Sequence, residues 1–169
     1  MHAMDVRTEI NYPNTSPEQA FALGMDRAFR AAVCEATHAT SYEVAISEHD
    51  DGRASVRIDR TMPAELPDIA RKVMGENVTV VQTEEWSAPA QGGARTAELT
   101  ISIQGQPAKM VGTIALESVD ASARMRIAGD VKVSMPFFGR RIEAEVAKAI
   151  VAAAAKEQQT GLSWLSRQG

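Results

Sequence analysis

The chain has 169 residues, of which 44% are hydrophobic and 24% are charged, and its formal net charge is −4. This length suffices for one domain with a substantial core, and the composition excludes a disordered chain. The acidic balance argues against a nucleic-acid partner, which normally requires a basic face. The single cysteine, Cys34, excludes an intrachain disulfide and a zinc site built on thiolates, and its apolar neighbours predict a buried thiol.

No segment is long and apolar enough to span a bilayer, and residues 1–7 contain no apolar stretch typical of a secretory signal. We therefore expect a cytoplasmic protein without stable membrane insertion. One domain over residues 4–166 accounts for the whole pattern described below.

The first predicted elements are a strand and two short helices. Apolar residues alternate with polar ones over residues 6–12, which indicates a strand. A typical helix start follows, with Ser16 as the cap and Gln19 placed for a capping box. An apolar face then continues to about Ala36, with a bend near Asp26 that divides the segment in two.

The middle of the chain is rich in strands. Alternation over residues 42–46 and 56–62 around an Asp-Asp-Gly turn predicts a hairpin. The spacing of apolar residues predicts a short helix over 69–75 with a glycine stop. Four more strands follow, separated by short turn sequences, so neighbouring strands should pair antiparallel: 78–86, 96–104, 109–117 and 124–135.

The last third combines a strand of strict alternation with one long helix. The odd positions from Met125 to Met135 are apolar or glycine, and Pro136 ends the ladder because it has no N–H to donate. Apolar residues then recur every fourth position, which predicts a helix running without a loop from about Phe137 to Ser166. Gly161 is expected to fray or bend its last turn.

The order of elements predicts an α+β fold in which a curved antiparallel sheet of roughly seven strands wraps around a long C-terminal helix. This order, with the strand-to-helix junction at Pro136, resembles the helix-grip fold of the START-like (SRPBCC) superfamily, which includes polyketide cyclases and lipid-transfer domains. More narrowly, it resembles an uncharacterised bacterial family within that superfamily. The resemblance covers about residues 5–165.

The resemblance implies a deep apolar cavity between the sheet and the helix that holds a hydrophobic small molecule such as a lipid or polyketide, for transport or sensing. The residues expected to line it lie on the inward parity of the strands or on the helix stripe: Arg60, Met62, Glu84, Trp86, Leu99, Ile101, Met110, Ile114, Met125, Ile127, Met135, Phe138, Ile142 and Val146. No cofactor is expected.

Two of these residues, Arg60 and Glu84, are charged, although they occupy strand positions that alternate in step with apolar residues. If their strands face inward, the two side chains pair with each other across the sheet or meet a polar group of a ligand, and burial would raise the pKa of Glu84. The alternative, which we favour from sequence, is that a bulge or twist turns these strand ends toward solvent.

No residue set indicates a reaction, so we assign no catalytic residue. Glu35 and His38 have the spacing of half a helix-borne metal site, but the second half is missing and no metal is expected. Two alternatives to a binding protein remain. One is a cyclase or aromatase-like enzyme that uses Glu84 or Arg60. The other is a cavity-free interaction protein, with a homodimer suggested by the alanine-rich helix and Trp164.

Overall fold

The structure is a computed structural model that describes residues 3–64, 71–72 and 75–168. The described strands are β1 (Met4–Pro13), β2 (Ser41–Glu48), β3 (Ala54–Pro63), β4 (Asn77–Trp86), β5 (Arg95–Ile103), β6 (Ala108–Val119) and β7 (Ser122–Val133). The described helices are α1 (Pro17–Gly24), α2 (Arg27–Ala36), α4 (Gly139–Gln168) and the 3-10 turn η1 (Gln91–Gly93). The short helix expected over 69–75 falls largely outside the described residues.

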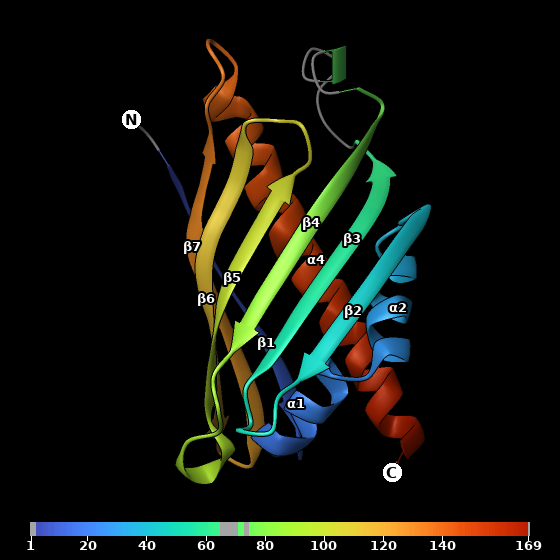
Figure 1. Cartoon of the computed structure of the whole chain (residues 1–169), viewed down its shortest axis with the longest axis vertical. Helices are drawn as coiled ribbons and strands as arrows, with labels where there is room; N and C mark the ends of the chain where they lie inside the picture. The colour runs from blue at the N-terminus through green and yellow to red at the C-terminus, as the bar shows by residue number, and fades with distance from the viewer. Residues whose placement is uncertain (1–2, 65–70, 73–74, 169) are drawn as a thin grey trace.

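The seven described strands form one antiparallel sheet in the order β1-β7-β6-β5-β4-β3-β2, and α4 runs along one face of it (Figure 1). From β2 to β7 each strand pairs with its successor in the chain, as the short connections predict. The pairing of β1 with β7, which sets Met4 opposite Val131, is the long-range one. The α+β class, the antiparallel sheet, the long C-terminal helix and the two short helices after the first strand are confirmed.

The two short helices begin at the residues that the sequence predicts. The Ser16 hydroxyl accepts a hydrogen bond from the Gln19 amide N–H at 3.1 Å, and the Gln19 side chain accepts one from the Ser16 N–H at 2.8 Å. This reciprocal pair is the capping box. Asp26 caps α2 by accepting from the Ala28 N–H at 2.9 Å, so the bend near Asp26 is confirmed as a helix boundary.

The junction between β7 and α4 differs from the prediction. The strand ends at Val133 and the helix begins at Gly139, so a turn separates two elements that were expected to be continuous. Phe137 in this turn has φ +67°, which is incompatible with helix, and its side chain is 99% exposed. The buried Glu143 carboxylate closes the turn by accepting a hydrogen bond from the Val133 N–H at 2.9 Å.

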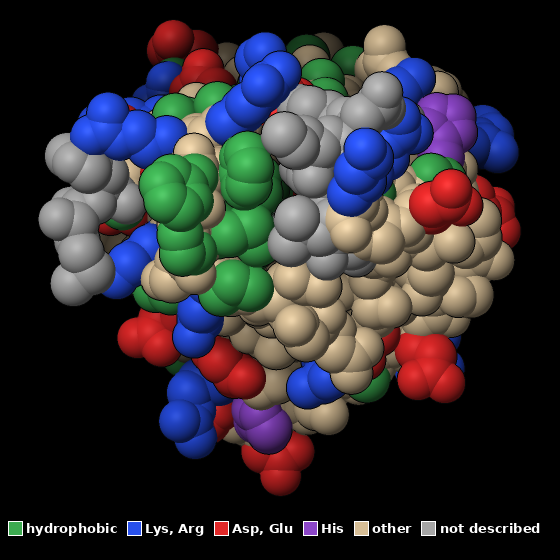
Figure 2. Space-filling view, turned by 90° about the horizontal axis from the view of Figure 1, so that it is seen from above, with side chains coloured by type: hydrophobic (Ala, Val, Ile, Leu, Met, Phe, Trp, Pro, Cys, Tyr) green, Lys and Arg blue, Asp and Glu red, His purple; other side chains and the backbone are tan. Residues whose placement is uncertain are grey.

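Figure 2 looks onto this end of the molecule and shows hydrophobic side chains gathered near Lys and Arg.

The C-terminal half of α4 is attached to β1. The Gln158 side chain accepts a hydrogen bond from the Asn11 N–H at 2.8 Å. Three residues further along, Gly161 is buried against the Tyr12 ring, and a Cβ atom at Gly161 would lie 2.5 Å from Tyr12 Cε1. The expectation that Gly161 frays the helix is therefore wrong. The helix continues to Gln168, and the glycine allows the strand and the helix to approach.

Two glycines face each other in the middle of the sheet. Gly112 of β6 pairs with Gly129 of β7. A Cβ on Gly112 would overlap the Ala128 carbonyl oxygen and lie 2.8 Å from the Gly129 Cα, and one on Gly129 would lie 2.6 Å from the Val111 carbonyl oxygen. Only glycine fits this close approach of two backbones, which is typical of a strongly coiled part of a sheet.

Candidate functional site

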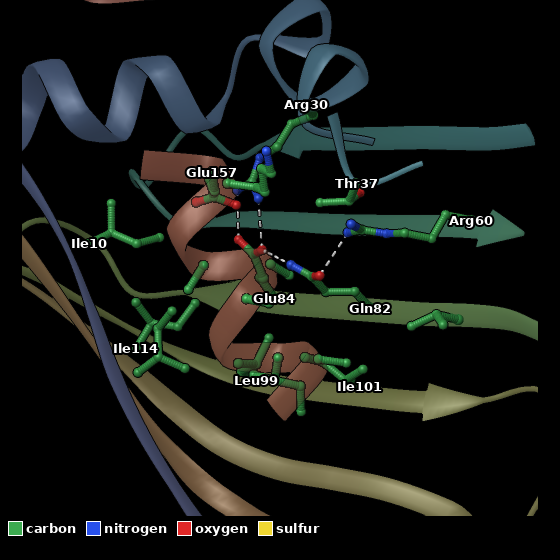
Figure 3. Close-up of a pocket in the computed structure, with 18 of the residues that line it drawn as sticks. Ile10, Arg30, Thr37, Arg60, Gln82, Glu84, Leu99, Ile101, Ile114 and Glu157 are labelled. Atoms are coloured by element: carbon green, nitrogen blue, oxygen red, sulfur yellow. Dashed lines mark hydrogen bonds and ion pairs between the residues drawn. The ribbon is translucent and has the colours of Figure 1, made fainter. Parts of the chain in front are cut away.

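A cavity of about 420 Å³ lies between α4 and the sheet, with further wall residues from α1 and α2. This volume falls in the range of about 300–1,000 Å³ that is typical of small-molecule sites. Its two sides differ in chemistry. Figure 3 shows Leu99, Ile101 and Ile114 on one side, whereas charged side chains occupy the other. The cavity contradicts the filled-core alternative.

Ten of the fourteen residues expected to line a cavity lie in its wall: Arg60, Met62, Glu84, Trp86, Leu99, Ile101, Ile114, Met125, Ile127 and Val146. The other four, Met110, Met135, Phe138 and Ile142, are not among the lining residues. Met110 and Ile142 are each 1% exposed and belong to the packed core, and Met135 and Phe138 pack against that core. The alternation along a strand and the apolar stripe of a helix do not tell residues of the cavity wall from residues of the packed core.

The opening of the cavity is marked by lining residues that are also exposed to solvent, which are His38, Pro63, Ala149, Ala152 and Lys156. They place the opening between α4, the residues just after α2 and the C-terminal end of β3. Several alanines of α4 line the cavity, and their short side chains leave space beneath the helix.

The central interaction of the polar side is a buried ion pair between α2 and β4. Arg30 donates from Nη1 and Nη2 to the two carboxylate oxygens of Glu84, at 2.9 and 2.8 Å. The Arg30 Nε donates to the Gly24 carbonyl at 2.7 Å, which holds the guanidinium in place. Both residues are buried, with Glu84 1% exposed. This bidentate geometry is the strongest form of the arginine–carboxylate contact.

Glu84 receives two further hydrogen bonds from its own strand, from Gln82 Nε2 at 2.6 Å and from Trp86 Nε1 at 2.8 Å. Burial alone would raise the pKa of Glu84, but the charge of Arg30 and the hydrogen bonds from Arg30, Trp86 and Gln82 outweigh it, so the pKa lies below its usual value. Each carboxylate oxygen already accepts two donors. Glu84 is therefore poorly suited to move protons.

Two sequence-based expectations about this region are wrong. We favoured strand ends that turn Arg60 and Glu84 toward solvent, whereas both are buried. The predicted consequence of burial, a raised pKa for Glu84, is also wrong because Arg30 lies opposite it. The two residues do not pair with each other: Arg60 Nη2 donates to Gln82 Oε1 at 2.9 Å, and Gln82 bridges to Glu84 (Figure 3).

Tyr12 and Glu157 complete the polar side. The Tyr12 hydroxyl is buried and has no hydrogen-bond partner among the described residues. Burial, with the nearby charge of Glu157, raises the pKa of Tyr12. Figure 3 shows the Glu157 side chain on α4 close to Arg30. Burial raises the pKa of Glu157, an effect that Arg30 opposes and Glu84 reinforces.

Replacing Glu157 with glutamine is expected to raise the free energy of unfolding at neutral pH. The native pKa of Glu157 lies above the unfolded value of about 4.5. Ionisation therefore favours the unfolded chain, and this destabilisation is absent below about pH 4.5 and complete above the native pKa. Urea denaturation of both proteins across this pH range measures the difference. A glutamine variant that is no more stable than the parent at neutral pH would contradict the argument.

Arg30 and Glu157 were not identified from the sequence, although each had a signal. Arg30 lies four residues before Cys34, which the sequence predicts to be buried, so both share one side of α2. Glu157 lies seven residues after Ile150 and continues the apolar stripe of α4. A charged residue within the apolar stripe of a helix indicates a buried polar site, as does a charged residue among the inward-facing apolar positions of a strand.

Three other side chains that the sequence drew attention to have structural contacts. The Trp164 ring packs edge to face against Phe29, with the ring centroids 5.9 Å apart, and so joins α4 to α2. Cys34 is buried, as predicted. Glu35 accepts a hydrogen bond from the Tyr42 hydroxyl at 2.7 Å, which attaches α2 to β2.

Comparison with solved structures identifies the fold as START-like. Zhui aromatase/cyclase from Streptomyces sp. R1128 gives a TM-score of 0.61 at 14% identity, over 99% of this chain and 96% of that one. TTHA0849 from Thermus thermophilus gives 0.60 at 18% identity, over 93% of each chain. A START superfamily protein from Mycobacterium smegmatis gives 0.55 at 16% identity, over 98% of this chain and 99% of that one. At these identities the likeness establishes the fold alone.

Sequence comparison adds a family. The family model described as "Protein of unknown function (DUF2505)" matches residues 7–165. No curated protein matches the chain. In the described part of the chain, none of the helices has the length and apolar character needed to cross a membrane.

Proposed function

The chain belongs to the DUF2505 family, and from its START-like fold and the cavity beneath α4 we propose that it binds a hydrophobic small molecule, such as a lipid or a polyketide, for transport or sensing. The observation that carries this proposal is an accessible cavity with one apolar side and a few fixed polar groups on the other. This combination is typical of small-molecule sites, in which apolar contact supplies affinity and a small number of polar groups orient the ligand.

The energetics favour such a ligand. Apolar surface removed from water contributes roughly 25 cal/mol per Å². The side chains of Leu99, Ile101 and Ile114 lie on the same side of the cavity and offer apolar surface for this contact. A cyclase-like reaction through Glu84 has less support, because its carboxylate is already saturated with donors and its pKa is lowered.

The direct test is native mass spectrometry of freshly purified protein, followed by incubation with a panel of fatty acids, sterols and aromatic polyketides. We expect a copurified small molecule or the uptake of at least one class from the panel. Repeated observation of the bare polypeptide, with no uptake from any class, would overturn the proposal.

Two residues one turn apart on α4 lie in different environments, one in the cavity wall and the other in the packed core. Val146 lines the cavity, whereas Ile142 is 1% exposed and lies outside the lining. We expect Val146→Phe to fill the cavity with a ring and to weaken uptake of an apolar dye by about tenfold or more, the equivalent of about 1.4 kcal/mol of lost contact. Its denaturant midpoint should change little. Ile142→Phe should instead overpack the core and cost about 1–3 kcal/mol.

The control for both variants is Val151→Phe, because Val151 is exposed on the same helix. It should leave dye binding unchanged and alter the free energy of unfolding by less than about 0.5 kcal/mol. Dye titration and urea denaturation of the three variants measure both quantities. If Val146→Phe is destabilised as much as Ile142→Phe and the parent protein takes up no dye, the region around Val146 is packed core.

A further inference from the structure

The two buried arginines of the cavity wall differ in whether a carboxylate pairs with them. Two buried cations, Arg30 and Arg60, line the described cavity. Arg30 has a bidentate carboxylate partner in Glu84. Arg60 is 8% exposed, yet no carboxylate of the described residues lies within 4.0 Å of its guanidinium in an ion pair. Buried charges are normally paired, since an unpaired one costs several kcal/mol.

The hydrogen bonds of Arg60 are also incomplete. Of its side-chain nitrogens, Nη2 donates to the neutral Gln82 side chain at 2.9 Å. The Nε atom is buried without an acceptor among the described residues. A guanidinium offers five N–H donors in a planar fork that matches a carboxylate. Part of that capacity is unused at a position in the cavity wall.

The other acids of the cavity are poor counter-ions for Arg60. Glu84 already accepts four hydrogen bonds and is held by Arg30. Glu157 makes no ion pair with Arg60 among the described residues. Burial raises the pKa of Glu157 and outweighs the charges of Arg30 and Arg60, which lower it, so the cavity disfavours the charged form of Glu157. No carboxylate of the described residues therefore contacts the Arg60 guanidinium directly, and a bound anion would supply that contact.

We propose that the ligand is an amphipathic acid, with a carboxylate bound by Arg60 and an apolar body extending over Ile101, Leu99 and Ile114. This inference rests on the proposed function and names the class of molecule that the cavity selects. Figure 3 shows the direction in which the apolar body of the ligand would extend. The Arg60 guanidinium lies beside Gln82, and the apolar side chains of β5 and β6 lie further along the cavity wall. A charge-assisted hydrogen bond of this kind is worth more than one to a neutral hydroxyl.

The test compares two probes that differ only in their head group, dodecanoate and 1-dodecanol, by displacement of the neutral dye Nile red. Wild-type protein should bind dodecanoate about 10- to 100-fold more tightly than 1-dodecanol. Arg60→Met, which keeps an unbranched apolar stem and removes the guanidinium, should remove this preference while 1-dodecanol binds as before. Arg60→Lys keeps the positive charge but lacks the planar guanidinium, so it should retain part of the preference for dodecanoate over 1-dodecanol.

The matched control is Arg57→Met, on the same strand, where the exposed arginine is held by Asp59 at 2.9 Å and faces away from the cavity. It should keep the full preference for dodecanoate. Equal binding of acid and alcohol, unchanged by Arg60→Met, would overturn the acid proposal and leave the binding function intact. Failure of Nile red and both probes to bind would overturn both.

Discussion

Replacing Arg30 with methionine is expected to lower the free energy of unfolding by about 3–5 kcal/mol, because it leaves the buried Glu84 carboxylate without its counter-charge. Two hydrogen bonds of 2.8 and 2.9 Å are lost, and the carboxylate is only 1% exposed. Urea denaturation monitored by far-UV circular dichroism measures the loss. Arg27→Met is the control, since Arg27 is exposed on the same helix, and it should change stability by less than about 0.5 kcal/mol.

The double variant Arg30→Met with Glu84→Met removes both charges and should be more stable than Arg30→Met alone, because no isolated buried charge remains. The pH dependence has a defined sign. The native pKa of Glu84 lies below its usual value of about 4.5, so its ionisation stabilises the fold at neutral pH. This contribution is lost as pH falls below about 4.5 through the native pKa, and the double variant should lack it. A single variant as stable as the control would show that the pair contributes nothing.

Replacing Gly112 with alanine is expected to cost about 3 kcal/mol, at the upper end of the usual cost of overpacking. The added Cβ would meet the backbone of β7 at Ala128 and Gly129, and backbone atoms cannot move aside as a flexible side chain can. The pairing of β6 with β7 must therefore shift. Denaturant midpoints and amide hydrogen exchange in β7 measure the effect.

Gly105→Ala provides the comparison for Gly112→Ala. Gly105 lies in the turn between β5 and β6 with φ +75°, and a Cβ added there would have no described atom within 4 Å. Its substitution should cost only the strain of a left-handed alanine, about 1–2 kcal/mol. If the two alanine variants are equally stable, the contact between the strands is not what requires glycine at position 112.

The elements of this fold were predictable because each carries a local signal. The capping box at Ser16 and Gln19 and the period-two alternation of the strands depend on neighbours within a few residues. The junction at Phe137 was predicted incorrectly because Pro136 signals the end of a strand but not the length of the following turn. Gly112 and Gly129 give no local signal of their contact, which depends on strand register.

The site was only partly predictable for the same reason. Arg60 and Glu84 share the alternation of the apolar residues on their strands, but we expected these strand ends to turn toward solvent. The sequence could not show that partners existed to make burial tolerable. The partner of Glu84 is Arg30, which is 54 residues away in the chain. Ile142 and Val146 share one stripe of α4, and only the three-dimensional arrangement separates the core residue from the cavity residue.

The attachment of β1 to α4 has a consequence for the order in which the protein assembles. During synthesis, each strand from β3 to β7 can pair with the strand that precedes it in the chain. β1 can pair only after β7 has been synthesised, and its hydrogen bond from Asn11 requires Gln158, which lies 147 positions further along the chain. Such distant contacts carry the largest loop-closure entropy and form slowly. The wall that Ile10 and Tyr12 supply is therefore closed only when nearly the whole domain has been synthesised. A chain in which β1 is still unpaired therefore lacks the part of the cavity wall that Ile10 and Tyr12 supply.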